Sequence, residues 1–169
     1  MTRPITGEAA VYFFKYIELA EGQSIKEIIE NYSDKLNAYF QTIPEQKAAF
    51  AYAEGKWTVK EVLQHLIDTE RVFVYRALCF ARLQSNPLPS MDENAFAATA
   101  KTINQSLDQI KEEFTALRKS TDLFLLSLDE EELKRKGNAA GNDISVNALS
   151  YIIIGHLIHH MNILEERYF

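Results

Sequence analysis

The sequence predicts an all-α fold, an up-down antiparallel four-helix bundle formed as a single domain over residues 1–169. Four segments carry apolar residues at intervals of three or four, the spacing of an amphipathic helix. Only six glycines and four prolines occur, so long helices are favoured and a many-turned β architecture is not. Four such helices bury their apolar faces best by packing together, and a chain of this length can form a proper core.

The first helix is predicted from Ser24 to Phe40. Ser24 followed by Glu27 has the pattern of a capping box, and Ile43-Pro44 disfavours helical geometry beyond it. The preceding residues 1–23 are expected to be an N-terminal extension, in which residues 8–20 could form a partial helix. The segment 48–56 is expected to be a linker.

The second helix is predicted to begin at Thr58 and to continue to about Leu83. Thr58 and Glu61 form another capping-box pattern, and Trp57 is positioned to pack onto the first turn. The prolines within Ser85-Asn86-Pro87-Leu88-Pro89 end the helix.

The third and fourth helices are predicted over about Thr102 to Leu128 and from Ser145, a suitable N-cap, to the C-terminus. Between them, Glu130–Lys136 is expected to add a short turn. The segment Lys136–Asp143, which contains two glycines, is expected to be an exposed loop.

Composition excludes several classes of function. The net charge of −6 disfavours nucleic acid as a partner, because phosphate binding requires clustered Lys and Arg. Cys79 is the only cysteine, so no internal disulfide is expected and a reducing cytoplasm is the natural setting. Residues 1–8 lack the features of a signal peptide. The most apolar segment, 148–164, contains three histidines and an asparagine, so we expect no membrane span.

The arrangement of the four histidines is informative. His65 lies in the second predicted helix, and the other three fall within five residues of the fourth. His156 and His160 are one helical turn apart within the core-facing apolar stripe, whereas His159 lies about 60° to one side of His156. His65 stands between two apolar residues and should also face the core.

Two imidazoles one turn apart and a third from a neighbouring helix can bind one divalent ion, with zinc–nitrogen distances of about 2.0–2.1 Å. Three protein ligands leave a coordination position open for water or substrate, as in catalytic sites. The alternatives are hydrogen-bonded core histidines without a metal, or an exposed polar patch.

Several motifs together resemble the DinB-like (DinB/YfiT) superfamily. Trp57–Leu66 (WTVKEVLQHL), followed by Asp68-Thr69-Glu70, is similar to the second helix of that family. Gly155–His160 (GHLIHH) is similar to its final helix. The stretch 75–82 (YRALCFAR) and the residues Leu88-Pro89 and Asp92-Glu93 resemble a common bacterial subgroup.

The resemblance extends from about Ser24 to Phe169 and implies an up-down four-helix bundle with a three-histidine site for nickel or zinc. The ligand positions correspond to His65, His156 and His160, and His159 corresponds to a neighbour of the ligands. Better-understood members of the family are thiol-dependent transferases and an isomerase. The implied function is therefore a metal-dependent enzyme that activates a low-molecular-weight thiol or water, a thiol S-transferase or a hydrolase acting on a small molecule.

Two other functions remain open from the sequence. One is a non-catalytic metal-binding or stress-associated bundle, whose ion only stabilises the fold. The other is an interaction module without metal. The aromatic content of 11% could support a homodimer, although the pairing face is not evident. An open coordination position beside a polar pocket would favour the enzyme.

Further candidates surround the proposed ligands. His159, Asp68, Glu70 and Asp92 could act in acid–base chemistry or hold the ligands in place, although acidic residues near helix ends are more often solvated. Glu70 is about 140° from His65 around the helix.

Arg76 and Arg82 could bind an acidic thiol or substrate. They are about 120° apart around the helix, so both should not face one pocket. Cys79 could be buried and inert or reactive.

Overall fold

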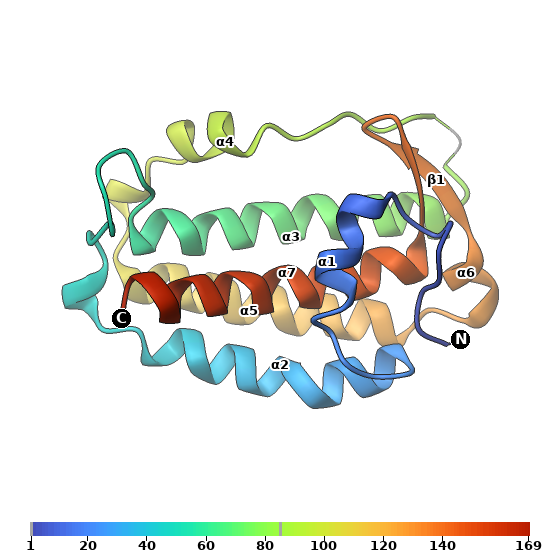
Figure 1. Ribbon diagram of the computed structural model, residues 1–169, viewed down its shortest axis with the longest axis horizontal. Coiled ribbons are helices and arrows are strands. Elements are labelled where there is room, and N and C mark those ends of the chain that lie inside the picture. Colours follow the sequence, from blue (N-terminus) through green and yellow to red (C-terminus); the bar gives the residue numbers. More distant parts are fainter. Residues whose placement is uncertain (1, 85) are drawn as a thin grey trace.

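A computed structural model, which describes residues 2–84 and 86–169, confirms the predicted all-α four-helix bundle (Figure 1). Met1 and Ser85, expected in the N-terminal extension and in the segment ending the second helix, lie outside the described residues. The four long helices are α2 (Ile25–Thr42), α3 (Val59–Ala81), α5 (Leu107–Leu126) and α7 (Val146–Arg167).

Side-chain caps determine where these helices begin. Thr58 forms the predicted capping box with Glu61, and Ser145 accepts the Ala148 N–H at 2.9 Å. Ser24 accepts the Glu27 N–H at 3.2 Å, but the Glu27 carboxylate takes the N–H of Gln23 instead of that of Ser24. The first helix therefore has its predicted cap without the complete box.

The third helix begins five residues later than predicted. Ser106 and Gln109 form a capping box at its true start, and residues Thr102–Asn104 form a separate 3-10 turn. Lys101, before this turn, has a left-handed backbone with φ of 49°. The apolar spacing continues through Ile103, but this side chain is exposed and does not belong to the bundle core.

The helix directions do not alternate strictly along the chain. In Figure 1, α2 and α7 run one way and α3 and α5 run the other. Lys60 contacts Gln105 and Arg118 contacts Glu70, as expected for parallel neighbours α3 and α5. Because consecutive parallel helices need a long crossover, residues 82–106 span the length of the bundle.

Short elements connect the long helices or pack against them. The N-terminal segment contains a 3-10 turn, Val11–Phe13, and the four-residue helix α1 (Phe14–Ile17), which confirms a partial helix in this region. The crossover contains an additional helix, α4 (Glu93–Thr99), that the sequence did not predict. A further 3-10 turn covers Glu45–Lys47, and α6 (Glu130–Lys134) is the predicted short turn.

The segment 136–143 is not a loop, so that prediction was wrong. It forms an antiparallel hairpin of β1 (Lys136–Ala139) and β2 (Asn142–Ser145). Ala140 and Gly141 form the two-residue turn with φ of 53° and 79°, the left-handed pair that tight hairpins favour. A Cβ at Gly137 would lie 2.0 Å from Phe80 Cδ1, so glycine allows the hairpin to pack against the end of α3.

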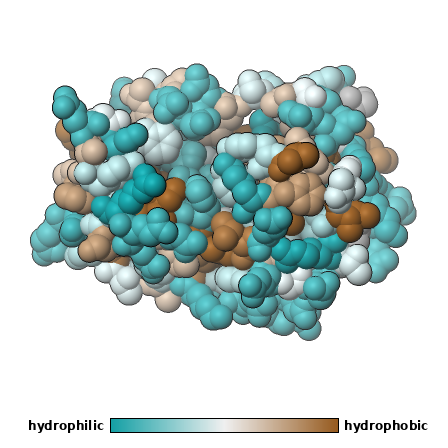
Figure 2. Space-filling view, in the orientation of Figure 1, coloured by the Kyte–Doolittle hydropathy of each residue, from teal (hydrophilic) through white to brown (hydrophobic). Residues whose placement is uncertain are grey.

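Helix α7 is the most buried element of the fold. Every residue from 146 to 158 is buried, because α1, α2, α3 and α6 all pack against this helix. In the described residues, no helix combines the length and apolar character needed to cross a membrane. Figure 2 shows hydrophilic residues over most of one face, with apolar residues in separate groups. The polar side chains of Asn147, Ser150 and His156 lie among the buried residues of α7.

Candidate metal centre

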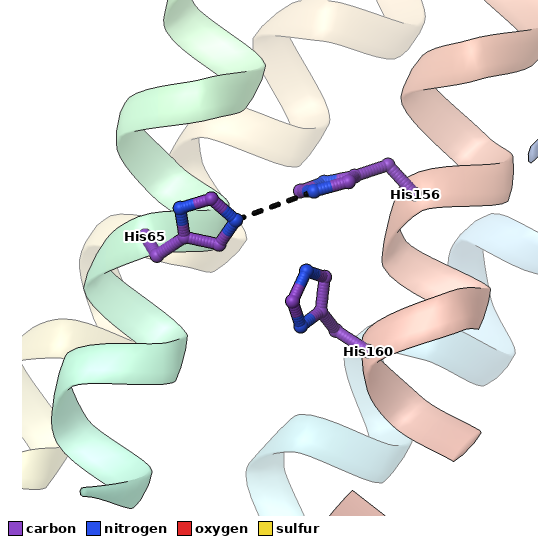
Figure 3. Close-up of side chains that lie close together, drawn as sticks. All are labelled: His65, His156 and His160. Carbon is purple, nitrogen blue, oxygen red and sulfur yellow. Dashed lines mark hydrogen bonds between the residues drawn. The ribbon is translucent and has the colours of Figure 1, made fainter. Parts of the chain in front are cut away.

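Three histidine side chains converge between α3 and α7 (Figure 3). His65 extends from α3, and His156 and His160 extend from successive turns of α7. The Nε2 atoms of His65 and His156 are 3.3 Å apart. One nitrogen from each of the three residues lies within 4.8 Å of the other two. The cluster therefore brings together the three residues that the sequence singled out.

The orientation of His65 is fixed by its neighbours on α3 and at the start of that helix. The Nδ1 atom lies 3.3 Å from the Thr69 hydroxyl, one turn further along, and Trp57 packs against the ring with centroids 4.8 Å apart. With Nδ1 hydrogen-bonded, Nε2 is the nitrogen that faces the cluster. A hydrogen bond at the remote ring nitrogen is the usual way in which a metal-binding histidine is held.

A glycine in α7 brings the N-terminal segment against the other side of the cluster. A Cβ at Gly155 would lie 1.9 Å from the Tyr16 carbonyl oxygen, so only glycine permits this approach of α1. The Tyr16 ring contacts those of His156 and His159 edge-on, with centroids 5.4 Å away in both cases. Helix α1 thus forms part of the wall around the histidines.

Burial keeps the clustered histidines neutral. Desolvation lowers the pKa of His65 to about 4, with the Glu93 carboxylate acting in the opposite direction. Desolvation, together with repulsion from His65, His159 and Lys15, lowers the pKa of His160 to about 3. The pKa of His156 is lowered well below its ordinary value, again mainly by burial. Three neutral imidazoles with converging nitrogens are a donor set suited to zinc, nickel or copper.

The cluster opens onto a cavity of about 470 Å³. The apolar part of its wall is largely aromatic, and the polar part includes two cationic side chains and one carboxylate. Leu66, Ile152 and Ile153, which could have sealed the site, are buried in the core and are not among the lining residues. The lining includes Tyr12, Lys15, Tyr16, Trp57, Phe73, Arg76, Glu93 and the four histidines.

Among the residues expected beside the ligands, only His159 lines this cavity. It is partly exposed, and burial lowers its pKa. Asp68 accepts a hydrogen bond from Gln64 and has a pKa raised by burial, but it does not reach the cavity. Asp92 caps α4 by accepting two backbone N–H groups.

Glu70 faces the other side of α3, as its angle from His65 predicted. It forms a buried ion pair with Arg118 of α5 at 2.8 Å. Arg118 also pairs with Asp122. Glu70 is therefore part of the contact between α3 and α5 and does not approach the histidines.

Arg76 of α3 and Arg82, the residue that follows this helix, separate as the helix geometry predicted. Arg76 lines the cavity and donates from Nη2 to the Pro89 carbonyl oxygen at 2.8 Å. Arg82 instead pairs with Glu132 of α6. Cys79 is half-buried and does not line the cavity.

Sequence reasoning missed an aromatic and basic group from the N-terminal segment. The hydroxyls of Tyr12 and Tyr16 lie 3.4 Å apart, and the Lys15 ammonium lies 4.0 and 4.7 Å from their ring centroids. The hydrogen bond from Tyr16 lowers the pKa of Tyr12, whereas burial raises that of Tyr16. Two features of the sequence could have indicated this group. One is Gly155 within an apolar helix, and the other is the i, i+3, i+4 spacing of Tyr12, Lys15 and Tyr16.

The fold and the cluster define a class of protein, a four-helix bundle with three histidines on two antiparallel helices in a geometry that suits one divalent ion. The chain belongs to the DinB superfamily, whose sequence model matches residues 28–164. No curated protein sequence matches the chain.

Two solved structures from Bacillus subtilis resemble the fold. YfiT is 18% identical, with a TM-score of 0.71 over 96% of this chain and 89% of its own. It is described as a probable metal-dependent hydrolase with an unusual four-helix bundle topology. A DinB-like protein, YjoA, is 19% identical, with a TM-score of 0.55 over 80% of this chain and 82% of its own. At these identities the likeness establishes the fold.

Proposed function

We propose that the protein is an enzyme that binds one divalent metal ion through His65, His156 and His160 and acts on a small molecule in the adjoining cavity. The observation that carries this proposal is the position of the cluster, whose three neutral imidazoles line a cavity of about 470 Å³. Structural metal sites are normally closed by four protein ligands, whereas catalytic sites have three and an open position. The cavity therefore favours an enzyme over a non-catalytic bundle.

A divalent ion at this position would lower the pKa of bound water or a bound thiol and so supply a nucleophile at neutral pH. With water the reaction is hydrolysis of an ester or amide, and with a low-molecular-weight thiol it is S-transfer. The description of YfiT as a probable metal-dependent hydrolase supports the first type. Zinc and nickel are the ions that we propose, because both favour nitrogen ligands.

Residues around the cavity would position the metal ligands and transfer protons. Thr69 holds the ring of His65, and Trp57 packs against it. Tyr12 has an exposed hydroxyl-bearing side chain on the cavity wall and a lowered pKa, so we propose it as a proton donor to the leaving group. His159 is a second candidate for proton transfer at the edge of the cavity.

Metal content tests the proposal directly. After reloading with zinc or nickel and removal of excess ion, elemental analysis should find about one equivalent in the wild-type protein, set by a single ligand cluster. His160→Ala should lose it. His159→Ala is the matched control, because it removes a neighbouring imidazole that is not part of the cluster, and it should retain the metal.

The loaded protein would then be assayed for ester and amide hydrolysis and for thiol transfer to an electrophile. Hydrolysis or thiol transfer that rises and falls with metal content across the variants would support the proposal that the protein is an enzyme. Wild-type protein that takes up no zinc or nickel would refute the metal site, and bound metal without either activity would favour the non-catalytic bundle.

A further inference from the structure

Among the residues that the structure describes, Arg76 is a buried cation without an acidic partner. The residue is only 7% exposed, yet its one hydrogen bond among the described residues goes to the neutral Pro89 carbonyl. Arginines rarely become this buried unless they are paired, and a guanidinium carries five N–H donors. The neighbouring arginines do have acidic partners, since Arg71 of α3 pairs with Glu113 and Arg82, just after the end of α3, pairs with Glu132.

The unpaired guanidinium faces the same cavity as the histidines. Arg76 is eleven positions after His65, so the two differ by about 20° around α3 and lie about 16 Å apart along its axis. Phe73 lies between the two groups. Its ring centroid is 6.0 Å from the Arg76 guanidinium carbon and 6.0 Å from the His156 ring centroid. A ligand with an apolar body could therefore contact Phe73 while one of its ends lies at Arg76 and the other at the histidine cluster.

The charges around the cavity favour an anion. Arg76 and Lys15 are cationic, Glu93 is the only carboxylate among the described lining residues, and the histidines are neutral. The cavity wall therefore has more cationic than anionic side chains, although the whole chain has a net charge of −6. This excess of positive charge does not depend on a bound metal. Burial also lowers the pKa of Arg76, with no carboxylate offsetting the effect.

We propose that the cavity binds a small, largely apolar molecule with a terminal carboxylate, and that Arg76 binds this carboxylate while the reactive end of the molecule lies at the histidine cluster. A planar guanidinium matches one carboxylate through two parallel hydrogen bonds. The aromatic rings of Phe13, Trp57 and Phe73 provide the apolar wall. The reactive end rests on the proposed function, but the contact with Arg76 does not.

A matched pair of probes tests this contact. Calorimetry would compare 4-phenylbutyrate with its uncharged amide, 4-phenylbutyramide, on the full chain after chelator treatment and again after loading with zinc. Hydrogen bonds to charged groups contribute enough for the acid to bind about 10- to 100-fold more tightly than the amide in both states.

Variants assign the preference to one residue. Arg76→Gln should abolish the preference for the acid, because it removes the positive charge. The glutamine keeps an amide that can donate to the Pro89 carbonyl. Arg76→Lys should retain part of the preference, because charge is kept and the bidentate geometry is lost. Arg71→Gln is the matched control, because Arg71 is on the same helix and outside the cavity, and it should behave as wild type.

The proposal is overturned if the acid does not bind, if acid and amide bind equally to the wild type, or if Arg76→Gln keeps the preference. A preference that requires zinc and disappears in His160→Ala would place the carboxylate at the metal and also overturn it. Should Arg76→Gln fail to fold, the acid–amide comparison and Arg76→Lys remain decisive. An Arg76-dependent preference in protein that takes up no metal would instead refute the proposed function alone.

Discussion

Burial of the histidine cluster couples its protonation to the stability of the fold. His65 and His160 are neutral in the folded metal-free protein, since their pKa values are about 4 and about 3. In the unfolded chain an exposed histidine has a pKa near 6.5. Above about pH 6.5 neither the folded nor the unfolded state binds a proton on these histidines. Between the folded-state pKa of each histidine and its unfolded-state pKa, only the unfolded state is protonated. Folding therefore becomes less favourable as the pH falls.

We expect the free energy of unfolding of the metal-free protein to decrease as the pH is lowered from 7.5 to 5. Each buried histidine should contribute up to about 1.4 kcal/mol per pH unit below pH 6.5. Urea unfolding of chelator-treated protein measures the slope, and His160→Gln should reduce it. His159→Gln, which removes a less buried histidine, should reduce it less. A slope that is unchanged by His160→Gln would contradict the prediction.

At the scale of single elements, local signals predicted the long helices well. The caps at Ser24, Thr58 and Ser145 set the starts of α2, α3 and α7 within one residue. Continued apolar spacing through Ile103 hid the true start of α5. The hairpin could not be predicted from its own residues, because it depends on Gly137 packing against Phe80 and on backbone pairing with Leu88.

The candidate site was predictable to the extent that it lies on α3 and α7. Helical spacing alone places His156 and His160 on one core-facing stripe, and it separates Glu70 from His65. Lys15, Tyr16 and Glu93 come from α1 and α4, whose positions depend on long-range packing and on the crossover. Sequence periodicity carries no information about such contacts.

Gly155→Ala distinguishes close packing of α1 from ordinary helix propensity. In a typical helix interior this change stabilises by about 0.5–1 kcal/mol. Here the new Cβ would lie 1.9 Å from the Tyr16 carbonyl oxygen, so we expect destabilisation by about 1–3 kcal/mol as α1 is displaced. Urea unfolding measures the change, and NMR should show shifted ring resonances of His156 and His159. A more stable variant would show that α1 does not approach α7 in this way.

At the scale of the whole molecule, the cluster joins two helices that are far apart in the sequence. Residues 65 and 156 meet because the crossover 82–106 lets α3 and α5 run in parallel and leaves α7 antiparallel to α3. Helices α1, α2, α3 and α6 all pack against α7. An ion bound by α3 and α7 together would bind the folded chain and not the dispersed ligands of the unfolded one, so metal binding should stabilise the entire bundle.

We expect zinc to raise the midpoint of thermal unfolding. At free zinc 100-fold above the dissociation constant, binding to the folded state alone contributes about 2.7 kcal/mol. For a chain of this size that corresponds to an increase of roughly 5–10 °C. Calorimetry of wild type and His159→Ala should both show the increase, whereas His65→Ala should not, because it removes the histidine that α3 contributes to the cluster. A shift that persists in His65→Ala would mean that the ion binds within α7 alone and does not join the two helices.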